Sequence, residues 1–240
     1  MKKIIQLCLT ITFVFSAVSF AKPGEKAPNR KPDEGQTYER LILRGGTLIS
    51  GEGAPPIGPV DITIERNKVV QIKSVGHPGV PIKQRGRPIA KLGDKEINIE
   101  GKYILPGFVD MHGHIGGSAD DIPAEYVFKL WLAHGITTIR EPGSFNGLDW
   151  VLDHKKRSDN NTIVAPRIVP YVGFGMGWDE PIYTAKHARK WVKYIAKQGA
   201  KGIKFFGATP KIMKAALDEA KKQKLGTMMH HAQLNVMRMN

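Results

Sequence analysis

Hydrophobic and polar positions follow different patterns in two parts of the chain. After Leu105, short apolar runs alternate with longer stretches in which apolar residues recur every three or four positions. Short apolar runs are typical of buried strands and the longer stretches of amphipathic helices, so this alternation predicts βα units and a parallel sheet. Five strands are expected, at residues 107–112, 136–140, 167–172, 202–206 and 227–231.

Helices are predicted between these strands, three of them clearly bounded. Residues 124–133 should end at His134-Gly135, because a cation followed by glycine is typical of a helix carboxyl terminus. Residues 184–198 place Trp191 on an apolar face and stop at Gly199, and residues 211–222 repeat the pattern. The tryptophan is interpreted as a core residue.

The segment before Leu105 has short β-like runs at 41–43, 47–49, 60–64 and 69–72. Turn-forming groups separate these runs, namely Gly45-Gly46, residues 51–59 and Asn67-Lys68. The sequence therefore predicts a small all-β domain at residues 37–105, ahead of an α/β region at 106–240.

The amino terminus has the layout of a signal peptide. Lys2 and Lys3 precede an apolar run at residues 4–20, and Ser19 and Ala21 place small residues before Lys22. We expect residues 1–21 to be cleaved and the protein to be periplasmic or secreted, with no stable membrane insertion afterwards. The alternative, a membrane anchor, is disfavoured because the run is barely long enough and is interrupted by polar residues.

Two further expectations concern the mature chain. Residues 22–36 are rich in Pro, Gly, Lys and Glu, which predicts a flexible leader. The only cysteine, Cys8, lies within the predicted signal peptide, so disulfides and thiolate metal ligands are excluded after cleavage. Any metal must therefore be held by nitrogen and oxygen atoms.

The formal net charge is +14, which raises the question of a nucleic-acid partner. The basic residues are spread along the chain, and the local clusters at 155–157 and 221–224 fall in helix-like stretches, where a solvated face explains them. We therefore expect no nucleic-acid partner. The oligomeric state is not indicated by the sequence.

The strongest chemical motif is an apolar strand that ends in two histidines, His112 and His114. Side chains at positions i and i+2 of a strand share a face, so the two imidazoles can chelate one divalent ion such as zinc. Asp110 lies two residues before His112, so in a strand it points to the same face but one step deeper. Its carboxylate can orient a metal ligand without binding the metal itself. The alternative is that the histidines merely end a strand beside several glycines.

The stretch from Pro106 to His114 resembles the first-strand motif of the amidohydrolase superfamily, and the resemblance extends through residues 135–140 and Ala165-Pro166-Arg167. It implies an α/β fold with an incomplete TIM-type barrel, about five of eight strands, after the small all-β domain. It also implies that His112 and His114 bind one or two divalent metal ions, with zinc favoured.

The resemblance extends to Lys204, which takes the place of a fourth-strand lysine that is often carboxylated and bridges two metals. A lysine between large apolar residues should have a lowered pKa and a nucleophilic amine able to capture carbon dioxide. The alternative is a lysine that extends from a strand end to solvent.

The family takes a further metal ligand from a fifth-strand histidine commonly followed by alanine. His231, followed by Ala232, fits this pattern better than His230, which is left as a packing or supporting group. Neighbouring strand residues face opposite ways, so at most one of the two should bind metal. The remaining histidines are interpreted as structural: His77, His134, His154 and His187.

Glu141 and Tyr171 lie at predicted strand ends, where a barrel places substrate-facing groups, although a plain polar strand end explains both equally well. Family members often have aspartate near the position of Glu141.

The resemblance implies hydrolysis of a carbon–nitrogen bond in a small-molecule substrate, other than an ordinary peptide bond, by a metal-activated water. The family's later histidine ligand and proton-moving aspartate would lie beyond Asn240, so no proton-shuttling residue is identified and truncation is expected. The alternative function is a non-catalytic secreted fragment that binds metal weakly or not at all.

Overall fold

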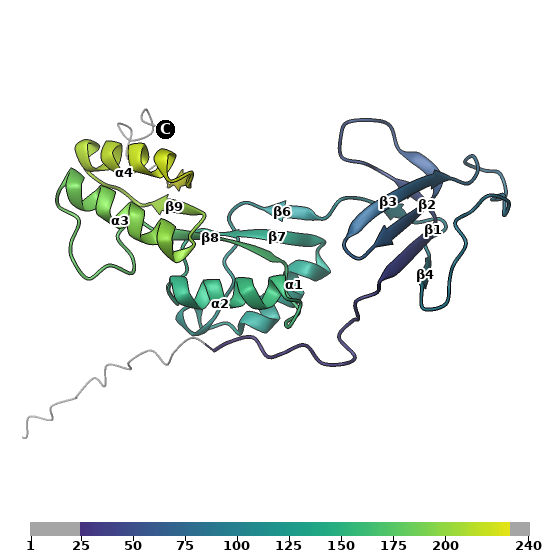
Figure 1. The fold of residues 1–240 in the computed structure, drawn as a ribbon, viewed down its shortest axis with the longest axis horizontal. Helices are drawn as coiled ribbons and strands as arrows, with labels where there is room; N and C mark the ends of the chain where they lie inside the picture. Colours follow the sequence, from purple (N-terminus) through teal and green to yellow (C-terminus); the bar gives the residue numbers. More distant parts are fainter. Residues whose placement is uncertain (1–24, 231–240) are drawn as a thin grey trace, which may run out of the picture.

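The computed structural model describes residues 25–230, which form two five-stranded sheets joined in sequence (Figure 1). The predicted signal peptide, its Cys8 and the candidate ligand His231 lie outside the described residues. The first sheet contains β1 (Arg40–Leu48), β2 (Ile57–Glu65), β3 (Lys68–Ser74), β4 (Lys95–Asn98) and β5 (Tyr103–Ile104). This sheet falls within the predicted all-β segment.

One turn expected in the first sheet is wrong. Gly45-Gly46 does not separate two strands, because β1 runs through both glycines with register shifts on either side of Gly46 against β2. A Cβ on Gly46 would lie 2.4 Å from Cδ1 of Ile99, so a side chain there would require Ile99 to shift. The glycines therefore serve close packing inside a strand, and a glycine pair alone does not distinguish this from a turn.

The second sheet is parallel throughout, in the order β10-β9-β8-β7-β6. Its strands confirm the five predicted ones in position, with shifts at their ends: β6 (Phe108–Asp110), β7 (Ile136–Glu141), β8 (Arg167–Gly173), β9 (Gly202–Phe205) and β10 (Gly226–Met229). Within the described chain, β6 and β10 each pair on one side only.

The helices lie between these strands in sequence, as the alternating pattern predicts. They are the short 3-10 helix η1 (Ser118–Asp120), α1 (Ala124–Ala133), α2 (Leu148–Asp159), α3 (Ala185–Gln198) and α4 (Pro210–Lys222). Helix α3 begins where Thr184 accepts a hydrogen bond from the His187 amide, and it ends at Gly199, whose φ of 105° favours glycine. The described helices include none long and apolar enough to cross a membrane.

Strand β8 divides the second sheet into two halves. Its first residues pair with β7, from Arg167 opposite Thr138 onward, and its last residues pair with β9, from Tyr171 opposite Gly202 onward. Each half has its own apolar core. One core includes Phe128 and Ile139, and the other includes Trp191 and Phe205. Figure 1 shows α1 and α2 beside the first half of the sheet and α3 and α4 beside the second. Strands β7 and β9 therefore pair with different parts of β8, so the two halves of the sheet are staggered along it. A stagger of this kind accompanies the closing of a sheet into a barrel.

The segment expected to be a flexible leader packs, over residues 25–34, against η1, α1, α2 and the loop after α2. Ala27 is buried, its amide donates to Nε2 of His154 at 3.1 Å, and its carbonyl accepts from Arg157 at 2.5 Å. Arg30 donates to the carbonyl of Ile163 at 3.0 Å. The composition of this segment is polar because its contacts are hydrogen bonds, and composition alone could not reveal partners about 130 residues away.

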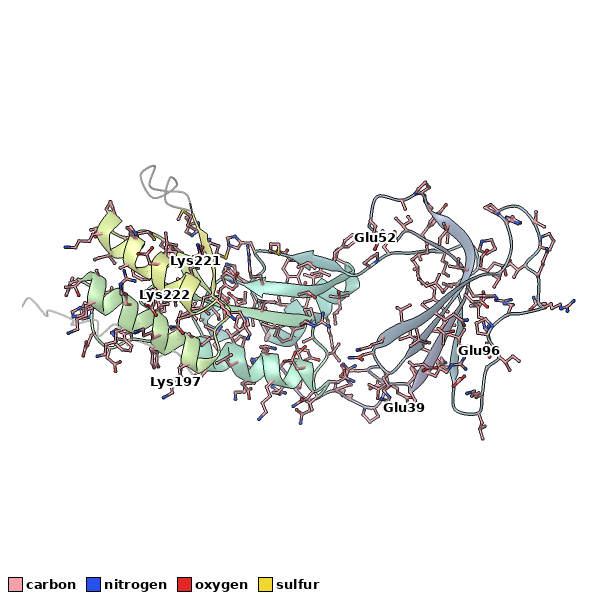
Figure 2. The ribbon with its side chains drawn as sticks, turned by 45° about the horizontal axis from the view of Figure 1, so that its top comes forward. Glu39, Glu52, Glu96, Lys197, Lys221 and Lys222 are labelled. Atoms are coloured by element: carbon pink, nitrogen blue, oxygen red, sulfur yellow. The ribbon has the colours of Figure 1, made fainter. Side chains whose placement is uncertain are left out.

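The basic cluster at 221–224 lies on a solvated face as predicted, whereas in the cluster at 155–157 the Arg157 side chain is largely covered because it donates to the Ala27 carbonyl. Figure 2 shows Lys197, Lys221 and Lys222 on α3 and α4, at the end of the molecule opposite Glu39 and Glu96 of the first sheet. All three lysines lie in the last turns of their helices, where cations interact favourably with the helix dipole.

Candidate metal centre

Two histidines follow the first strand of the parallel sheet. Strand β6 ends at Asp110, so the expectation that His112 and His114 share a strand face is wrong, and both lie in the irregular segment after it. Their rings nevertheless lie close together, with centroids 5.7 Å apart and planes at 70°. The Asp110 carboxylate accepts a hydrogen bond from the His112 amide at 2.7 Å, which fixes the turn that brings the rings together.

Lys204 lies on the face of β9 opposite the helices. Its neighbours Ile203 and Phe205 pack into the core under α3 and α4, so strand alternation places Lys204 on the other face. Only 2% of Lys204 is exposed, and burial lowers the pKa of its amine, with a smaller effect from the positive charge of Arg140. Among residues 25–230, no carboxylate forms an ion pair with Lys204. The alternative of a lysine extending to solvent is therefore wrong.

The described histidine of the fifth strand is His230. Met228 pairs with Lys204 across the β9–β10 ladder, and Met229 packs against the helix core on the opposite face. His230 follows the parity of Met228, and its ring centroid lies 6.5 Å from that of His112 and 4.9 Å from that of Phe206. His231 lies outside the described residues, so its place as a ligand stays a prediction.

These groups influence one another electrostatically. Burial lowers the pKa of His112, and the positive charges of Lys204, His114 and His230 lower it further. All four basic groups therefore gather at the carboxyl edge of the sheet, although they come from three strands. Of these groups, His112 and Lys204 have lowered pKa values, which shift both toward the neutral form that binds a metal.

Glu141 provides the negative charge at this edge. Its side chain is fully buried, and Oε1 lies 3.2 Å from Nδ1 of His114. The hydrogen bond to Glu141 raises the pKa of His114 against the opposing effect of burial. The position of Glu141 at a strand end was evident from the sequence, but its partner was not, because the two residues lie 27 positions apart.

Tyr171 does not face the carboxyl edge. A Cβ on Gly202 would lie 2.3 Å from the Tyr171 ring, and a Cβ on Gly226 would lie 2.0 Å from its hydroxyl oxygen. The ring therefore covers the first residues of β9 and β10, at the end of the sheet away from the histidines. Arg140 stacks over it at 5.0 Å. The interpretation of Tyr171 as a substrate-facing group is wrong, since the two glycines leave a space that the ring fills.

The donor set fits a divalent metal. Zinc–nitrogen bonds of about 2.0 to 2.1 Å leave the ring centroids of two histidine ligands of one ion about 5 to 6 Å apart, and His112 and His114 lie within that range at 5.7 Å. Residues 25–230 contain no ready-made group of three His, Cys, Asp or Glu ligands. Within these residues, the side chains of His230 and Lys204 also bring nitrogen atoms near the pair.

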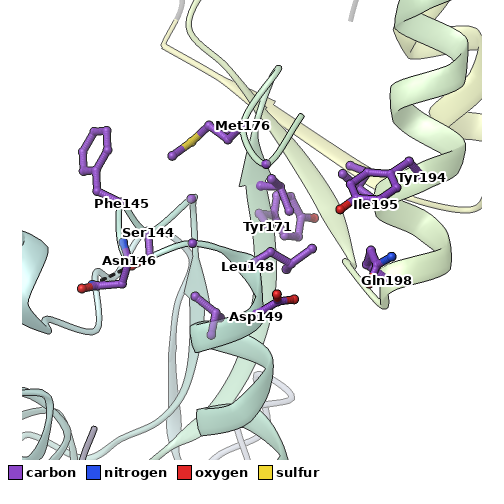
Figure 3. A pocket seen from close by; sticks show the side chains of 16 residues that line it. Ser144, Phe145, Asn146, Leu148, Asp149, Tyr171, Met176, Tyr194, Ile195 and Gln198 are labelled. Atoms are coloured by element: carbon purple, nitrogen blue, oxygen red, sulfur yellow. Dashed lines mark hydrogen bonds between the residues drawn. The ribbon is translucent and has the colours of Figure 1, made fainter. Parts of the chain in front are cut away.

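A cavity of about 400 Å³ lies beside this edge rather than at it (Figure 3). Its lining includes Ser144 and Asn146 of the β7–α2 loop and Tyr194 and Gln198 of α3, and it includes none of the histidines or Lys204. Its polar side chains are neutral apart from Asp149, so they provide no cluster of metal ligands. The cavity is therefore separate from the cluster of histidines and Lys204.

Comparisons with known proteins give partial matches. No protein-family model matches the sequence. An adenine deaminase of Geobacillus kaustophilus (strain HTA426) is 34% identical over 90 residues, which cover 34% of this chain and 15% of the deaminase. The described chain thus spans a small part of its curated relative.

Solved structures match over more of the chain, at identities that show the fold alone. A putative prolidase from Bifidobacterium longum has a TM-score of 0.63 at 20% identity, covering 85% of this chain and 52% of that one. A molinate hydrolase has a TM-score of 0.63 at 16% identity, covering 85% of this chain and 56% of the hydrolase. These matches show that the chain has the fold of these solved structures, of whose length it spans about half, and they agree with the resemblance of the motif at His112 and His114 to the amidohydrolase superfamily.

Proposed function

We propose that this protein is a metal-dependent hydrolase of carbon–nitrogen bonds other than ordinary peptide bonds, acting on a small molecule. The observation that carries the proposal is the gathering of His112, His114, Lys204 and His230 at one edge of a parallel sheet. The relatives named as deaminase, prolidase and hydrolase support the same class of reaction. The carboxyl edge of such a sheet is where barrel enzymes place their chemistry.

The five parallel strands are proposed to be the first part of a TIM-type barrel. Its metal site would take His112 and His114, Lys204 and one histidine of the fifth strand, for which parity supports His230 and the family pattern supports His231. When bound, one or two divalent ions, with zinc favoured, would lower the pKa of a water and polarise the scissile carbonyl.

Lys204 would serve this site as a carbamate. Burial lowers the pKa of this amine and so favours its neutral form, which adds to the carbon of carbon dioxide, forming a nitrogen–carbon bond and releasing one proton. The product is an anionic oxygen ligand on the same face of the sheet as the histidines. The lack of an ion-pair partner for Lys204 within residues 25–230 supports this role, since an unpaired buried ammonium is costly.

We also propose that the protein is exported and acts in the periplasm or outside the cell. The cationic and apolar start of the chain carries this proposal. Determining the amino terminus of the protein recovered from its native host tests it, with a mature chain beginning at Lys22 expected. An intact amino terminus at Met1 would contradict it.

The hydrolase proposal is tested on the purified chain by metal analysis and by amine release. We expect bound zinc and release of amine from a panel of N-acyl amino acids, cyclic ureas and aminopurines. His112→Ala should abolish both. His134→Ala is the matched control and should leave both unchanged, because within residues 25–230 the ring of this exposed histidine bonds only to the Leu130 carbonyl. Metal-free protein that releases no amine at saturating zinc would favour the non-catalytic alternative.

A further inference from the structure

The Glu141 carboxylate forms three hydrogen bonds at the carboxyl edge of the parallel sheet, where the proposed metal centre lies. Oε1 lies 3.2 Å from Nδ1 of His114 and accepts from the Gly143 amide at 3.0 Å, and Oε2 accepts from the Ile115 amide at 2.9 Å. One buried side chain thus ties the segment after β6 to the loop after β7. Within residues 25–230, His114 is the only side chain that forms an ion pair or hydrogen bond with this carboxylate.

These bonds determine which nitrogen of His114 carries the proton. A carboxylate only accepts, so the neutral imidazole facing it must donate from Nδ1, and its lone pair is then on Nε2. Nε2 forms no hydrogen bond with any other residue in the described chain, and 53% of the His114 side chain is exposed. The nitrogen left available is therefore the one that faces outward from Glu141.

The two amide bonds hold the carboxylate in place. Ile115 directly follows His114, and its amide donates to Oε2 while the His114 ring bonds to Oε1. Glu141 therefore fixes both the His114 ring and the backbone next to it. His112 is held differently, since Asp110 accepts from its backbone amide and not from its ring. Of the two neighbouring histidines, only His114 has its protonated nitrogen specified by a buried acid.

We propose that Glu141 is a positioning residue that fixes His114 as the Nδ1–H tautomer, with Nε2 directed toward the metal. This inference rests on the proposed function. Carboxylates that support a ligating histidine commonly change metal affinity by about ten- to a hundredfold when they are removed. Glu141 acts through His114 and does not itself touch substrate.

The test measures the His114 tautomer and zinc affinity separately. Nitrogen-15 NMR of the metal-free chain, at a pH where the imidazoles are neutral, should show His114 as Nδ1–H. Glu141→Ala should shift it toward Nε2–H and weaken zinc binding by about ten- to a hundredfold, measured by chelator competition. Glu141→Gln retains an acceptor and should preserve most of the Nδ1–H form, with a smaller loss of affinity.

Glu219→Gln is the matched control, because this glutamate on α4 is also buried, with 3% exposed, and its partners are Arg189 and Gln223 rather than a histidine. It should lower stability without moving either readout. Zinc binding that is insensitive to Glu141→Ala, or an unchanged tautomer, would overturn the role of Glu141 alone. A wild-type chain that shows the Nδ1–H form but binds no zinc would overturn the metal centre as well.

Discussion

Asp61 in the first sheet and Glu141 in the second are both fully buried carboxylates, but their partners differ in kind. Asp61 accepts from Arg44 at 3.0 Å, from Arg87 at 2.8 and 2.9 Å, and from the Gly45 amide at 3.0 Å. Burial opposes ionisation of Asp61, but the hydrogen bonds from Arg87 and Arg44 outweigh it and lower its pKa. Its partners remain charged at every ordinary pH.

Glu141 faces a half-exposed histidine and two backbone amides. A histidine has a second nitrogen that can act elsewhere, whereas the arginines around Asp61 donate to Asp61 and Glu96 and to the Pro88 carbonyl and Gln84 side chain of the neighbouring loop. The comparison teaches that burial of an acid does not by itself indicate a functional site. What differs is the partner. An acid paired with a histidine leaves one ring nitrogen able to bind another group, whereas an acid paired with arginines only stabilises the fold.

The largest expected effect comes from breaking the Asp61 cluster. Asp61→Asn leaves two arginines without their shared counter-charge, so the free energy of unfolding should fall by about 3 to 5 kcal/mol. Urea denaturation measures this fall. Zinc affinity of the folded fraction should stay unchanged. A loss of zinc affinity comparable to that of Glu141→Ala would show that the two acids do not play separate roles.

A smaller effect of opposite sign is expected at Lys204. Lys204→Met replaces a buried amine without an ion-pair partner in the described chain by an apolar side chain of similar length, so the free energy of unfolding should rise by about 1 kcal/mol. The gain in metal affinity on adding bicarbonate should disappear. Lys201→Met, at an exposed position, is the control and should change neither quantity. Destabilisation by Lys204→Met would indicate that the amine has a structural partner.

His154 sharpens the comparison between histidines. Unlike His114, it has both ring nitrogens bonded, to the Trp150 carbonyl at 2.8 Å and the Ala27 amide at 3.1 Å. Burial lowers its pKa below the ordinary 6.5. The unfolded chain then binds the proton more readily, so stability is present above pH 6.5 and falls as the pH decreases toward the folded-state pKa.

Urea denaturation between pH 8 and pH 5, at about half-unit steps, measures this dependence. Hydrogen exchange at Ala27 should accelerate over the same interval, since protonated His154 can no longer accept from that amide. His154→Phe should flatten the pH dependence. An unchanged profile in this variant would assign the dependence to other groups.

The smallest effect is expected at the exposed ion pair of Lys155 and Asp159, which lie one turn apart on α2. Asp159→Asn should change the free energy of unfolding by less than about 0.5 kcal/mol, because exposed pairs of this kind contribute little. Thermal and urea denaturation measure the difference. A loss approaching that of Asp61→Asn would contradict the view that burial, and not charge pairing itself, makes the Asp61 cluster important.

The sequence by itself determined the parallel strands and the helices of the second region. Alternating short apolar runs and helical repeats are local properties, and Gly135 and Gly199 end helices through their own backbone preferences, so β6 to β10 and α1, α3 and α4 were predictable. Lys204 and the histidine pair were also evident, because strand ends in a parallel sheet meet at one edge.

Only the tertiary structure decided how these residues are used. The bond between Glu141 and His114, the burial of Lys204, the contact of Ala27 with His154 and the place of Tyr171 over two glycines all join residues distant in sequence. Such contacts depend on sheet register and on the stagger along β8. A shift of one residue in register turns a side chain to the other face of the sheet. His230 lies near His112 because it shares the face of Met228 and Lys204, which the sequence motif did not indicate.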